Sequence, residues 1–176
     1  MNIILLDNKS YFNLKDLKKS KFISNMDFNK EIQIAYKDER DLKLKKGSRV
    51  PNFIYVKDKE VHDLYNLLDK NKKTVLIFWA SWCPNCDEVI NYLENHNIKD
   101  MSNIKIITIS IDSIPQKSNH FIAMNDPKKE TFKAFNGNYV PTAFVISDND
   151  IENIIVGSDD ILGFFNNSMF FDDIWK

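Results

Sequence analysis

The sequence predicts an α/β protein built around one layered sheet. Two long, mostly apolar runs, residues 74–80 (TVLIFWA) and 103–111 (NIKIITISI), are rich in β-branched and aromatic residues. Runs of this kind are typical of strands that are covered on both faces. A helical pattern separates the two runs, and two further strand patterns near the C-terminus are joined by a tight polar turn. Strands that alternate with helices and close with a hairpin indicate a sheet flanked by helices.

The first 46 residues differ in character from the rest of the chain. Hydrophobic periodicity predicts a strand over residues 2–6, a weakly amphipathic helix over 14–21 and a half-buried strand over 31–36. A run dense in both signs of charge then leads to Gly47. We therefore divide the chain into an N-terminal α+β extension, residues 1–46, and a main domain, residues 47–176.

In the main domain the expected elements alternate. The predicted strands are residues 53–56, 74–80, 103–111, 142–147 and 152–156, and the predicted helices are residues 61–70, 84–95, 128–135 and 159–175. The first helix is predicted because Val61, Leu64 and Leu68 recur at helical spacing. The helix over 84–95 should turn Val89 and Leu93 inward. The last two strands form a hairpin because only a short polar turn separates them.

Charge and composition exclude several classes of protein. The chain has 176 residues, with 24 Lys and Arg against 25 Asp and Glu, and a formal net charge of -1. This balance does not supply the broad basic field of a nucleic-acid-binding protein. The 4 glycines have no spacing of the G-x-G or Walker type, which excludes a glycine-loop nucleotide site.

The N-terminus also carries information on location. It lacks the cationic start and the apolar stretch of a signal peptide, and no run approaches the about 20 apolar residues that span a bilayer. We therefore expect a cytoplasmic protein without membrane contact. An extracytoplasmic location is the alternative if an anchor has been removed.

The two cysteines, Cys83 and Cys86, stand just beyond the first apolar run. With no further Cys they form neither a four-cysteine zinc site nor a multi-bridge scaffold, so they are a redox pair, part of a mixed metal site, or accidental. Pro84 suits a first helical turn, so the Cys83 sulfur should face unpaired backbone N–H groups at the positive end of the helix dipole. This environment favours the thiolate. Cys86 lies one turn on, at a distance that allows a disulfide and the resolution of a mixed disulfide.

The residues around the cysteines resemble those of a known family. Residues 78–86 (FWASWCPNC) resemble the F-W-A-x-W-C-x-x-C active-site segment of thioredoxin-fold proteins. Residues 50–53 resemble the opening strand of the TlpA/ResA-like branch, residues 126–135 the acidic residue and helix before its proline loop, and residues 140–142 (VPT) that loop. The resemblance covers residues 47–165 and implies a thioredoxin-like fold, a central mixed sheet flanked by helices, with thiol–disulfide oxidoreductase activity.

The resemblance further implies roles for individual residues. Cys83 would be the exposed nucleophile and Cys86 the buried resolving thiol. Pro141 would be a cis proline that shapes the substrate groove. Its neighbour Val140 would offer a backbone edge to an extended substrate segment. Trp82, beside the nucleophile, would contact the substrate.

The sequence departs from the thioredoxin pattern at two positions. Ile77 stands where thioredoxin proper has a buried Asp, so no carboxylate is available there to take the Cys86 proton. Glu88 and Glu94 replace it only if the helix turns them inward. Asp87 follows the second cysteine, where the family commonly has a basic residue. Its charge should make the Cys83 thiolate less favourable than in the strongest oxidants of the family.

The sequence therefore predicts a thiol–disulfide oxidoreductase that exchanges disulfides with protein or peptide substrates and with an upstream redox partner. No cofactor and no bound metal are expected apart from the Cys83–Cys86 couple itself. Two alternatives stay open. One is a non-catalytic binding module that uses the Val140–Pro141 edge. The other is a copper carrier, for which His120 is the candidate third ligand.

Overall fold

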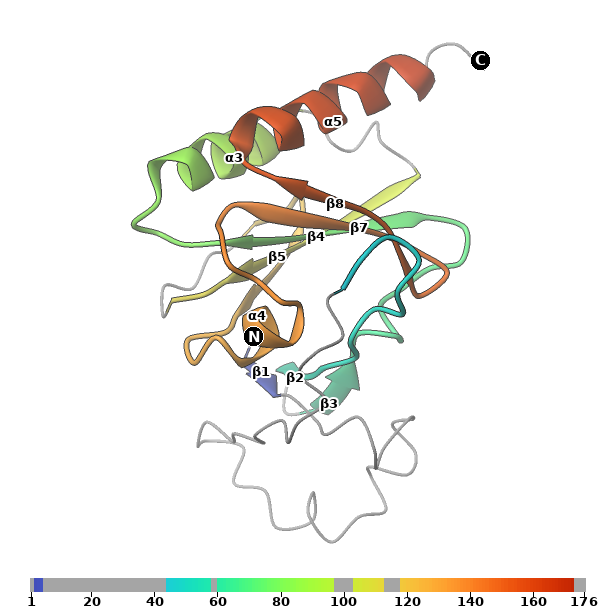
Figure 1. The fold of residues 1–176 in the computed structure, drawn as a ribbon, viewed down its shortest axis with the longest axis vertical. Coiled ribbons are helices and arrows are strands. Elements are labelled where there is room, and N and C mark those ends of the chain that lie inside the picture. Colours follow the sequence, from blue (N-terminus) through green and yellow to red (C-terminus); the bar gives the residue numbers. More distant parts are fainter. Residues whose placement is uncertain (1, 5–43, 58–59, 97–102, 113–117, 173–176) are drawn as a thin grey trace, which may run out of the picture.

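The computed structural model describes residues 2–4, 44–57, 60–96, 103–112 and 118–172. The predicted helix over 14–21 and the predicted strand over 31–36 lie outside the described residues. Eight strands form one mixed sheet, in the order β3-β2-β1-β6-β5-β4-β7-β8 (Figure 1). The strands are β1 (Asn2–Ile4), β2 (Ile54–Lys57), β3 (Glu60–Asp63), β4 (Lys73–Trp79), β5 (Ile104–Ser110), β6 (Ile122–Asn125), β7 (Thr142–Ser147) and β8 (Asp150–Val156).

The helices cover the sheet on both faces. They are α3 (Pro84–Asn95), α4 (Glu130–Ala134) and α5 (Ser158–Asp172). Figure 1 shows α3 and α5 together on one face and α4 on the other. The predicted architecture, a mixed sheet flanked by helices, is confirmed. It is mixed because β4 pairs parallel with β5 and antiparallel with β7.

The core is centred on β4. Its residues from Thr74 to Trp79 are all buried, as the continuous apolar run predicts for a strand covered on both faces. Phe78 lies among other aromatic rings, with ring centroids 5.3 Å from Phe132 and Phe135 and 6.0 Å from Phe144. These contacts fasten α4 and β7 to the central strand.

Several predicted elements are confirmed. Helix α3 has the predicted bounds, and Val89 and Leu93 are buried on its inner face. The hairpin between β7 and β8 turns at Asp148 and Asn149, whose φ values are 47° and 70°. Two successive positive φ values suit the right-handed twist of a hairpin, and Asn and Asp tolerate them better than most residues do.

The predicted helix over residues 61–70 is wrong. The structure has the strand β3 there, followed by turns. Tyr55 and His62 face each other across β2 and β3, with ring centroids 5.3 Å apart. The buried Asp63 ends the strand by accepting hydrogen bonds from the backbone and side-chain N–H groups of Asn66, each at 2.9 Å. Cross-strand pairing and this turn outweigh a helical spacing of leucines.

Strand β6 was not expected from the sequence. It is only four residues long and carries Asn125 at its end, so it lacks the long apolar run that marks β4 and β5. Its existence depends on pairing with β5, from Ile107 opposite Ile122 to Ser110 opposite Asn125. Such a strand is decided by its neighbour rather than by its own sequence.

The N-terminal residues join the same sheet. β1 pairs antiparallel with β2 and parallel with β6, so the strand predicted at residues 2–6 is present over Asn2–Ile4 and lies inside the sheet. The division of the chain at residue 46 stays a prediction. Beyond it, Gly47 donates a backbone hydrogen bond to Ile151 at 2.7 Å, with a φ of 84° that suits glycine.

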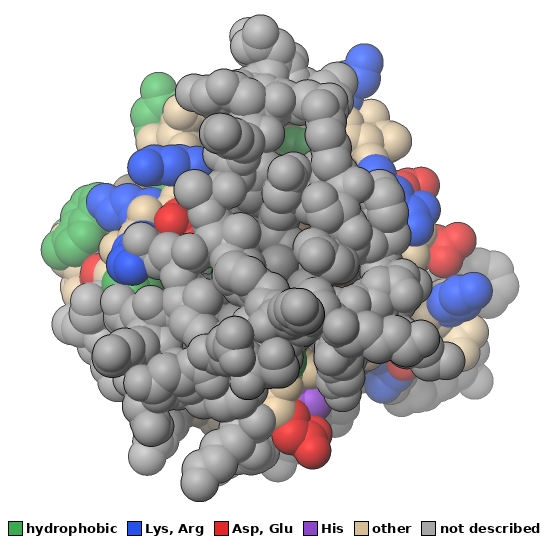
Figure 2. All heavy atoms as spheres, turned by 90° about the horizontal axis from the view of Figure 1, so that it is seen from below, with side chains coloured by type: hydrophobic (Ala, Val, Ile, Leu, Met, Phe, Trp, Pro, Cys, Tyr) green, Lys and Arg blue, Asp and Glu red, His purple; other side chains and the backbone are tan. Residues whose placement is uncertain are grey.

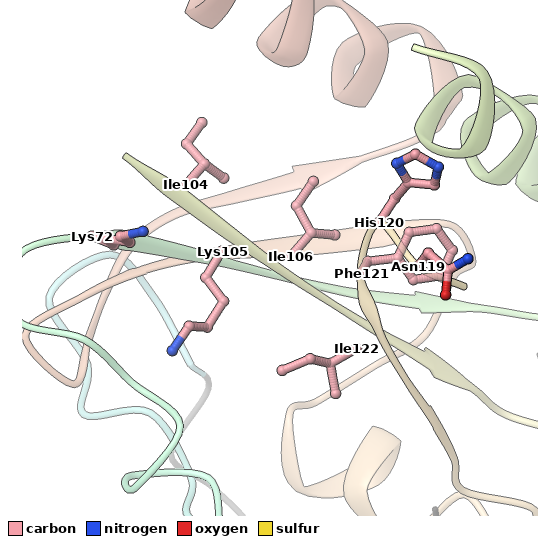
Figure 3. A pocket seen from close by; sticks show the side chains of 8 residues that line it. All are labelled: Lys72, Ile104, Lys105, Ile106, Asn119, His120, Phe121 and Ile122. Atoms are coloured by element: carbon pink, nitrogen blue, oxygen red, sulfur yellow. The ribbon is translucent and has the colours of Figure 1, made fainter. Parts of the chain in front are cut away.

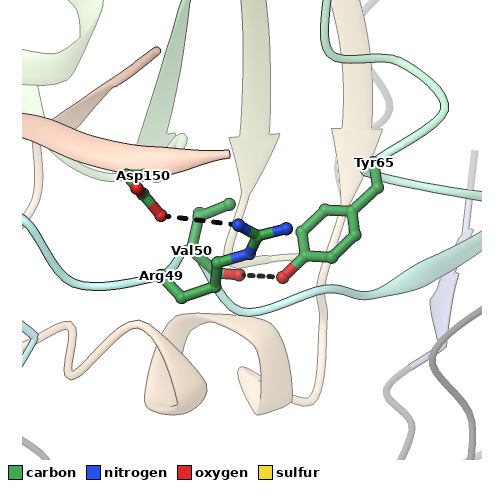
Figure 4. A network of polar contacts seen from close by, with 4 residues as sticks. All are labelled: Arg49, Val50, Tyr65 and Asp150. Atoms are coloured by element: carbon green, nitrogen blue, oxygen red, sulfur yellow. Dashed lines mark hydrogen bonds and ion pairs between the residues drawn. The ribbon is translucent and has the colours of Figure 1, made fainter. Parts of the chain in front are cut away.

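Arg49, near the start of the main domain, contacts two other segments of the chain: Tyr65, which follows β3, and Asp150, the first residue of β8 (Figure 4). Its guanidinium lies 3.8 Å from the Asp150 carboxylate and 5.4 Å from the centre of the Tyr65 ring. The Tyr65 hydroxyl donates to the Val50 carbonyl at 2.7 Å. Since the ion pair is exposed, it contributes orientation more than stability.

The described surface mixes both charges. In Figure 2, Lys and Arg side chains alternate with Asp and Glu around the rim of the face seen from below. Among the described residues, none of the helices combines the length and apolar character that crossing a bilayer requires.

Candidate active site

Cys83 lies where the sequence predicts it, between the end of β4 and the start of α3. Cys83 is the N-cap of α3, with φ -103° and ψ 107°, and Pro84 occupies the first helical position. Proline suits this position because its missing N–H would have no partner inside the helix. Both Cys83 and Cys86 are free thiols in this structure.

Two backbone groups contact the Cys83 sulfur. It accepts a hydrogen bond from the backbone N–H of Cys86, with Sγ and N 3.3 Å apart. It also lies 3.6 Å from the carbonyl oxygen of Val140, to which its thiol donates. A backbone N–H at a helix start stabilises negative charge on this sulfur. The Val140 carbonyl holds the thiol form in place.

Cys86 is the more enclosed of the two thiols. It is fully buried on the inner face of α3, whereas Cys83 is 7% exposed. Burial raises the pKa of the Cys86 thiol well above its ordinary value, and the nearby Cys83 sulfur and Asp87 carboxylate raise that pKa further. Cys86 therefore keeps its proton at neutral pH. Cys83 is the more accessible of the two thiols, but it is also buried, so the exposed nucleophile that the resemblance implies is not seen in this structure.

None of the residues Ile77, Glu88 and Glu94 offers Cys86 a carboxylate in this structure. Ile77 is buried in β4, so the strand offers no carboxylate beneath Cys86. Glu88 is exposed and Glu94 is half-buried on α3, and neither is hydrogen-bonded to Cys86. Asp87 is also exposed, and its negative charge raises the pKa of the Cys86 thiol.

The Val140–Pro141 loop stands against Cys83. The peptide bond between Val140 and Pro141 is cis, as the family resemblance implies. The loop is held on both sides: the Thr142 hydroxyl donates to the Tyr139 carbonyl at 2.7 Å, and the Gly157 N–H donates to the Pro141 carbonyl at 2.9 Å. Pro141 itself is buried, and Val140 is half-buried.

Exposed apolar side chains gather at this edge of the sheet. Within the described residues, the large hydrophobic side chains that face solvent are Trp82 (65% exposed), Tyr139 (71%) and Val156 (48%). Trp82 adjoins Cys83, Tyr139 adjoins Val140, and Val156 pairs with Thr142 across β7 and β8. Exposed large apolar side chains beside a reactive thiol are typical of a binding surface.

Sequence reasoning missed three residues of this region: Tyr139, Val156 and Asp112. Tyr139 could have been found because it directly precedes the proline loop. Val156 joins the surface only through strand pairing, which carries no local signal. Asp112 follows the end of β5 and accepts hydrogen bonds from the backbone N–H and the hydroxyl of Ser81, each at 2.7 Å.

His120 lies away from the cysteines. It lines a cavity of about 330 Å³ beside the first half of β5, together with side chains that include Ile104, Ile106 and Phe121 (Figure 3). Strand register places it two residues before Ile122, which pairs with the middle of β5, whereas Cys83 lies beyond the end of β4. The structure therefore does not bring His120 to the cysteines as a third ligand. Nor does any other group of three or more His, Cys, Asp or Glu gather at a metal-binding distance within the described part of the chain.

The comparisons with known proteins agree with this geometry. A curated relative, the sporulation thiol-disulfide oxidoreductase A of Bacillus subtilis, is 26% identical over 125 residues, which are 64% of this chain and 75% of the relative. A thioredoxin-like protein of Haemophilus influenzae is 26% identical over 102 residues, and the match spans 51% of this chain and 58% of that protein.

A solved structure shows the same fold. The crystal structure of a Chlorobium tepidum protein, provisionally named thiol:disulfide interchange protein DsbE, superposes with a TM-score of 0.58 at 22% sequence identity. The match covers 73% of this chain and 98% of that chain. The predicted thioredoxin-like fold is thereby confirmed. The resemblance to thiol–disulfide oxidoreductases agrees with the curated relatives above. The Redoxin family model matches residues 45–160, a span that includes the cysteine pair, the proline loop and both hairpin strands, and the chain belongs to the Redoxin family.

Proposed function

We propose that this protein is a thiol–disulfide oxidoreductase that exchanges disulfides with protein or peptide substrates through Cys83 and Cys86. One observation carries the proposal. The Cys83 sulfur caps a helix, 3.3 Å from the Cys86 N–H, and a second, buried thiol stands in the next turn. The names of the relatives, thiol-disulfide oxidoreductase and thioredoxin-like protein, support the same activity.

The reaction has two steps when the protein acts as a reductant. The Cys83 thiolate attacks one sulfur of the substrate disulfide, that S–S bond breaks, and the other substrate sulfur leaves as a thiolate that takes a proton. Cys86 then loses its proton and attacks the Cys83 sulfur of the mixed disulfide. The Cys83–Cys86 bond forms, the second substrate thiol is released, and two electrons have passed to the substrate. An upstream dithiol partner restores the starting form.

The substrate-binding residues in this proposal are Trp82, Val140 and Pro141. The Val140 carbonyl contacts the Cys83 sulfur, Pro141 follows Val140, and the exposed Trp82 and Tyr139 adjoin Cys83 and Val140 in the chain. An extended segment of a substrate protein would lay its backbone along Val140 and its apolar side chains on the exposed rings. The couple needs no further cofactor, because its own two thiols carry the electrons.

Neither alternative function is favoured. A binding module without catalysis has no use for a second thiol buried one helical turn from the first. A copper carrier would need a third ligand near the pair, and His120 lies elsewhere. The binding module predicts that Cys83→Ser leaves partner affinity and all measurable activity unchanged.

Replacing Cys83 tests the proposal directly. With a dithiol as electron donor, the wild type should reduce an insulin disulfide, and Cys83→Ser should lower that rate by at least about a thousandfold because a hydroxyl is a far weaker nucleophile. The proposal is wrong if the wild type is as inactive as the variant with every donor and acceptor tried.

Replacing Cys86 separates the two steps. In Cys86→Ser the first attack is preserved but no thiol can release the mixed disulfide, so the substrate should stay covalently bound through Cys83. Non-reducing electrophoresis would show a complex that dithiothreitol dissolves. An absence of complex in Cys86→Ser, with full activity in the wild type, would contradict the assigned order of attack.

The direction of electron flow follows from one measurement. Equilibration of the Cys83–Cys86 couple with glutathione gives its potential. A value near about -270 mV indicates a reductant, and one near about -120 mV indicates an oxidant. A reductant fits the cytoplasmic location that we expect from the sequence, whereas an oxidant fits an extracytoplasmic one.

A further inference from the structure

Asp112 ties the end of one strand to the loop that carries the nucleophile. Its Oδ2 accepts two hydrogen bonds from Ser81, one from the backbone N–H and one from the hydroxyl, each at 2.7 Å. Its Oδ1 accepts from the hydroxyl of Ser110, the last residue of β5. Ser81 stands two residues before Cys83. The half-buried carboxylate thus joins the ends of β4 and β5 at the site.

The other restraints on this loop act mainly at its ends, where Ala80 is buried and Cys83 caps α3 and contacts Val140. Trp82, between Ser81 and Cys83, is 65% exposed and so contributes little packing. The Cys83 N–H donates to the Ala80 carbonyl at 3.2 Å, which closes the turn but does not fix it relative to the sheet. Hydrogen bonds to a carboxylate are shorter and stronger than those between neutral groups. Asp112 therefore links the middle of this turn to the end of β5 through two charge-assisted hydrogen bonds.

We propose that Asp112 is a positioning residue for the dithiol, holding the turn of residues 80–83 so that the Cys83 sulfur stays in line for attack by Cys86. This deepens the proposed oxidoreductase function and rests on it. Resolution requires three sulfur atoms to be aligned, and a misplacement of about 1 Å can slow a reaction by up to about a hundredfold. Ser81 transmits the restraint, since it is the residue that Asp112 holds.

The reaction with dithiobis(nitrobenzoate) isolates the aligned step without a protein substrate. In the first phase the Cys83 thiolate attacks the reagent's disulfide, forms a mixed disulfide and releases one nitrothiobenzoate anion. In the second phase Cys86 loses its proton and attacks the Cys83 sulfur, the Cys83–Cys86 bond forms, and the second anion leaves. The first phase needs only an accessible thiolate, whereas the second depends on alignment.

Two variants of Asp112 distinguish its role in positioning the turn from an effect of its charge on the thiols. In Asp112→Ala the second phase should slow by about tenfold while the first stays within about twofold of the wild type. Asp112→Asn keeps an oxygen acceptor for Ser81, and its amide can donate to the Ser110 hydroxyl, so it should restore the second phase to within about threefold. Asp150→Asn, which removes a surface carboxylate at the opposite end of the sheet, is the matched control and should behave as the wild type.

Three outcomes overturn the proposal. They are a second phase in Asp112→Ala within twofold of the wild type, an equal slowing in Asp112→Asn, and a change confined to the first phase. The last two would mean that the carboxylate acts through its charge.

The variant Ser81→Ala decides if circular dichroism shows that Asp112→Ala does not fold. Ser81→Ala keeps the backbone hydrogen bond to Asp112 and loses the hydroxyl one, so it should slow the second phase by about threefold, and a normal rate refutes the proposal. Inactivity of the wild type on every protein disulfide tried would refute the proposed function alone, because the two phases need no protein substrate.

Discussion

Two buried groups hold their protons to a higher pH than usual, and they do so for the same reason. Burial raises the pKa of the Cys86 thiol, and burial also raises the pKa of Asp126 to about 6. Asp126 is only 3% exposed, and its two oxygens accept hydrogen bonds from the backbone N–H groups of Glu130 at 3.0 Å and Phe132 at 2.8 Å. These bonds lower the pKa but do not offset the burial. Asp126 thus accepts hydrogen bonds from backbone N–H groups at the start of α4, but its negative charge is destabilised by burial.

Asp126 should make the protein less stable as the pH rises from about 4 to about 7. Its folded-state pKa lies above the ordinary value of 3.8, so the folded protein keeps a proton that the unfolded chain releases. The contribution to stability is complete below pH 3.8 and is lost as the pH passes about 6. The difference between these values corresponds to about 3 kcal/mol. Urea unfolding at several pH values measures it.

Asp126→Asn is the comparison for this prediction. The amide does not titrate, so the difference in unfolding free energy between wild type and variant should shrink or change sign as the pH rises, moving in favour of the variant. If that difference is the same at pH 4 and pH 7, within about 0.5 kcal/mol, Asp126 does not titrate in this range and the prediction is wrong.

At the scale of elements, the short helix α4 and the loop after it set the position of Val140. Gly137 ends this unit by donating its N–H to the Phe132 carbonyl at 2.8 Å. A Cβ on Gly137 would lie 2.1 Å from the Phe132 ring. That ring cannot retreat easily, because it packs against Phe78 in the centre of the core. The close approach of the loop to α4 therefore requires glycine.

Gly137→Ala should destabilise the protein by about 1–3 kcal/mol, since overpacking displaces the ring or the loop. The same displacement should lower the rate of reaction with a protein disulfide, because the loop leads to Val140. Gly163→Ala is the control: that glycine lies inside α5 with nothing within 4 Å of the added Cβ, and the change should stabilise by about 0.5–1 kcal/mol. Equal urea midpoints for Gly137→Ala and the wild type would show that the core accommodates the added methyl group without loss of stability, and would contradict the prediction.

At the scale of the whole molecule, positive and negative charges are nearly balanced in number. The formal net charge is -1, and side chains of both signs occur among the described residues at the rim of the face in Figure 2. Large apolar side chains, those of Trp82 and Tyr139, are exposed next to Cys83 and Val140 in the chain, and the carboxylates of Asp87 and Glu88 are exposed on α3. Recognition of a substrate protein should therefore depend on apolar contact and backbone pairing more than on long-range attraction.

The rate with a protein disulfide should accordingly depend little on salt. Between about 0.02 M and about 0.5 M sodium chloride we expect kcat/KM to change by less than about threefold, because screening acts mainly on long-range charge interactions. The insulin assay at both salt concentrations is the measurement. A fall of tenfold or more would reveal a local field that steers substrates to the site.

Much of this molecule can be predicted from local sequence. The sequence predicts a helix that starts at Pro84, directly after the Cys83 thiol, and the structure confirms it. The prediction uses the apolar run of β4, which ends at Trp79, the proline after Cys83 and the spacing to Cys86. The polar turn at Asp148 and Asn149 likewise predicts the hairpin. These features depend on residues close together in the chain, so their physical chemistry can be evaluated from the sequence alone.

The remaining features depend on partners far apart in the chain. The leucines after Val61 have helical spacing, but pairing with β2 makes that segment a strand and a turn. β6 is a strand because β5 offers it an edge, and β1 lies inside the sheet between β2 and β6. The Val140 carbonyl meets the Cys83 sulfur, and Asp112 meets Ser81, across 57 and 31 positions of sequence. The sequence by itself determined the redox pair and its helix, because local hydrogen bonding and periodicity suffice for these. Only the tertiary structure decided what surrounds the pair, because strand pairing brings together residues that no local pattern connects.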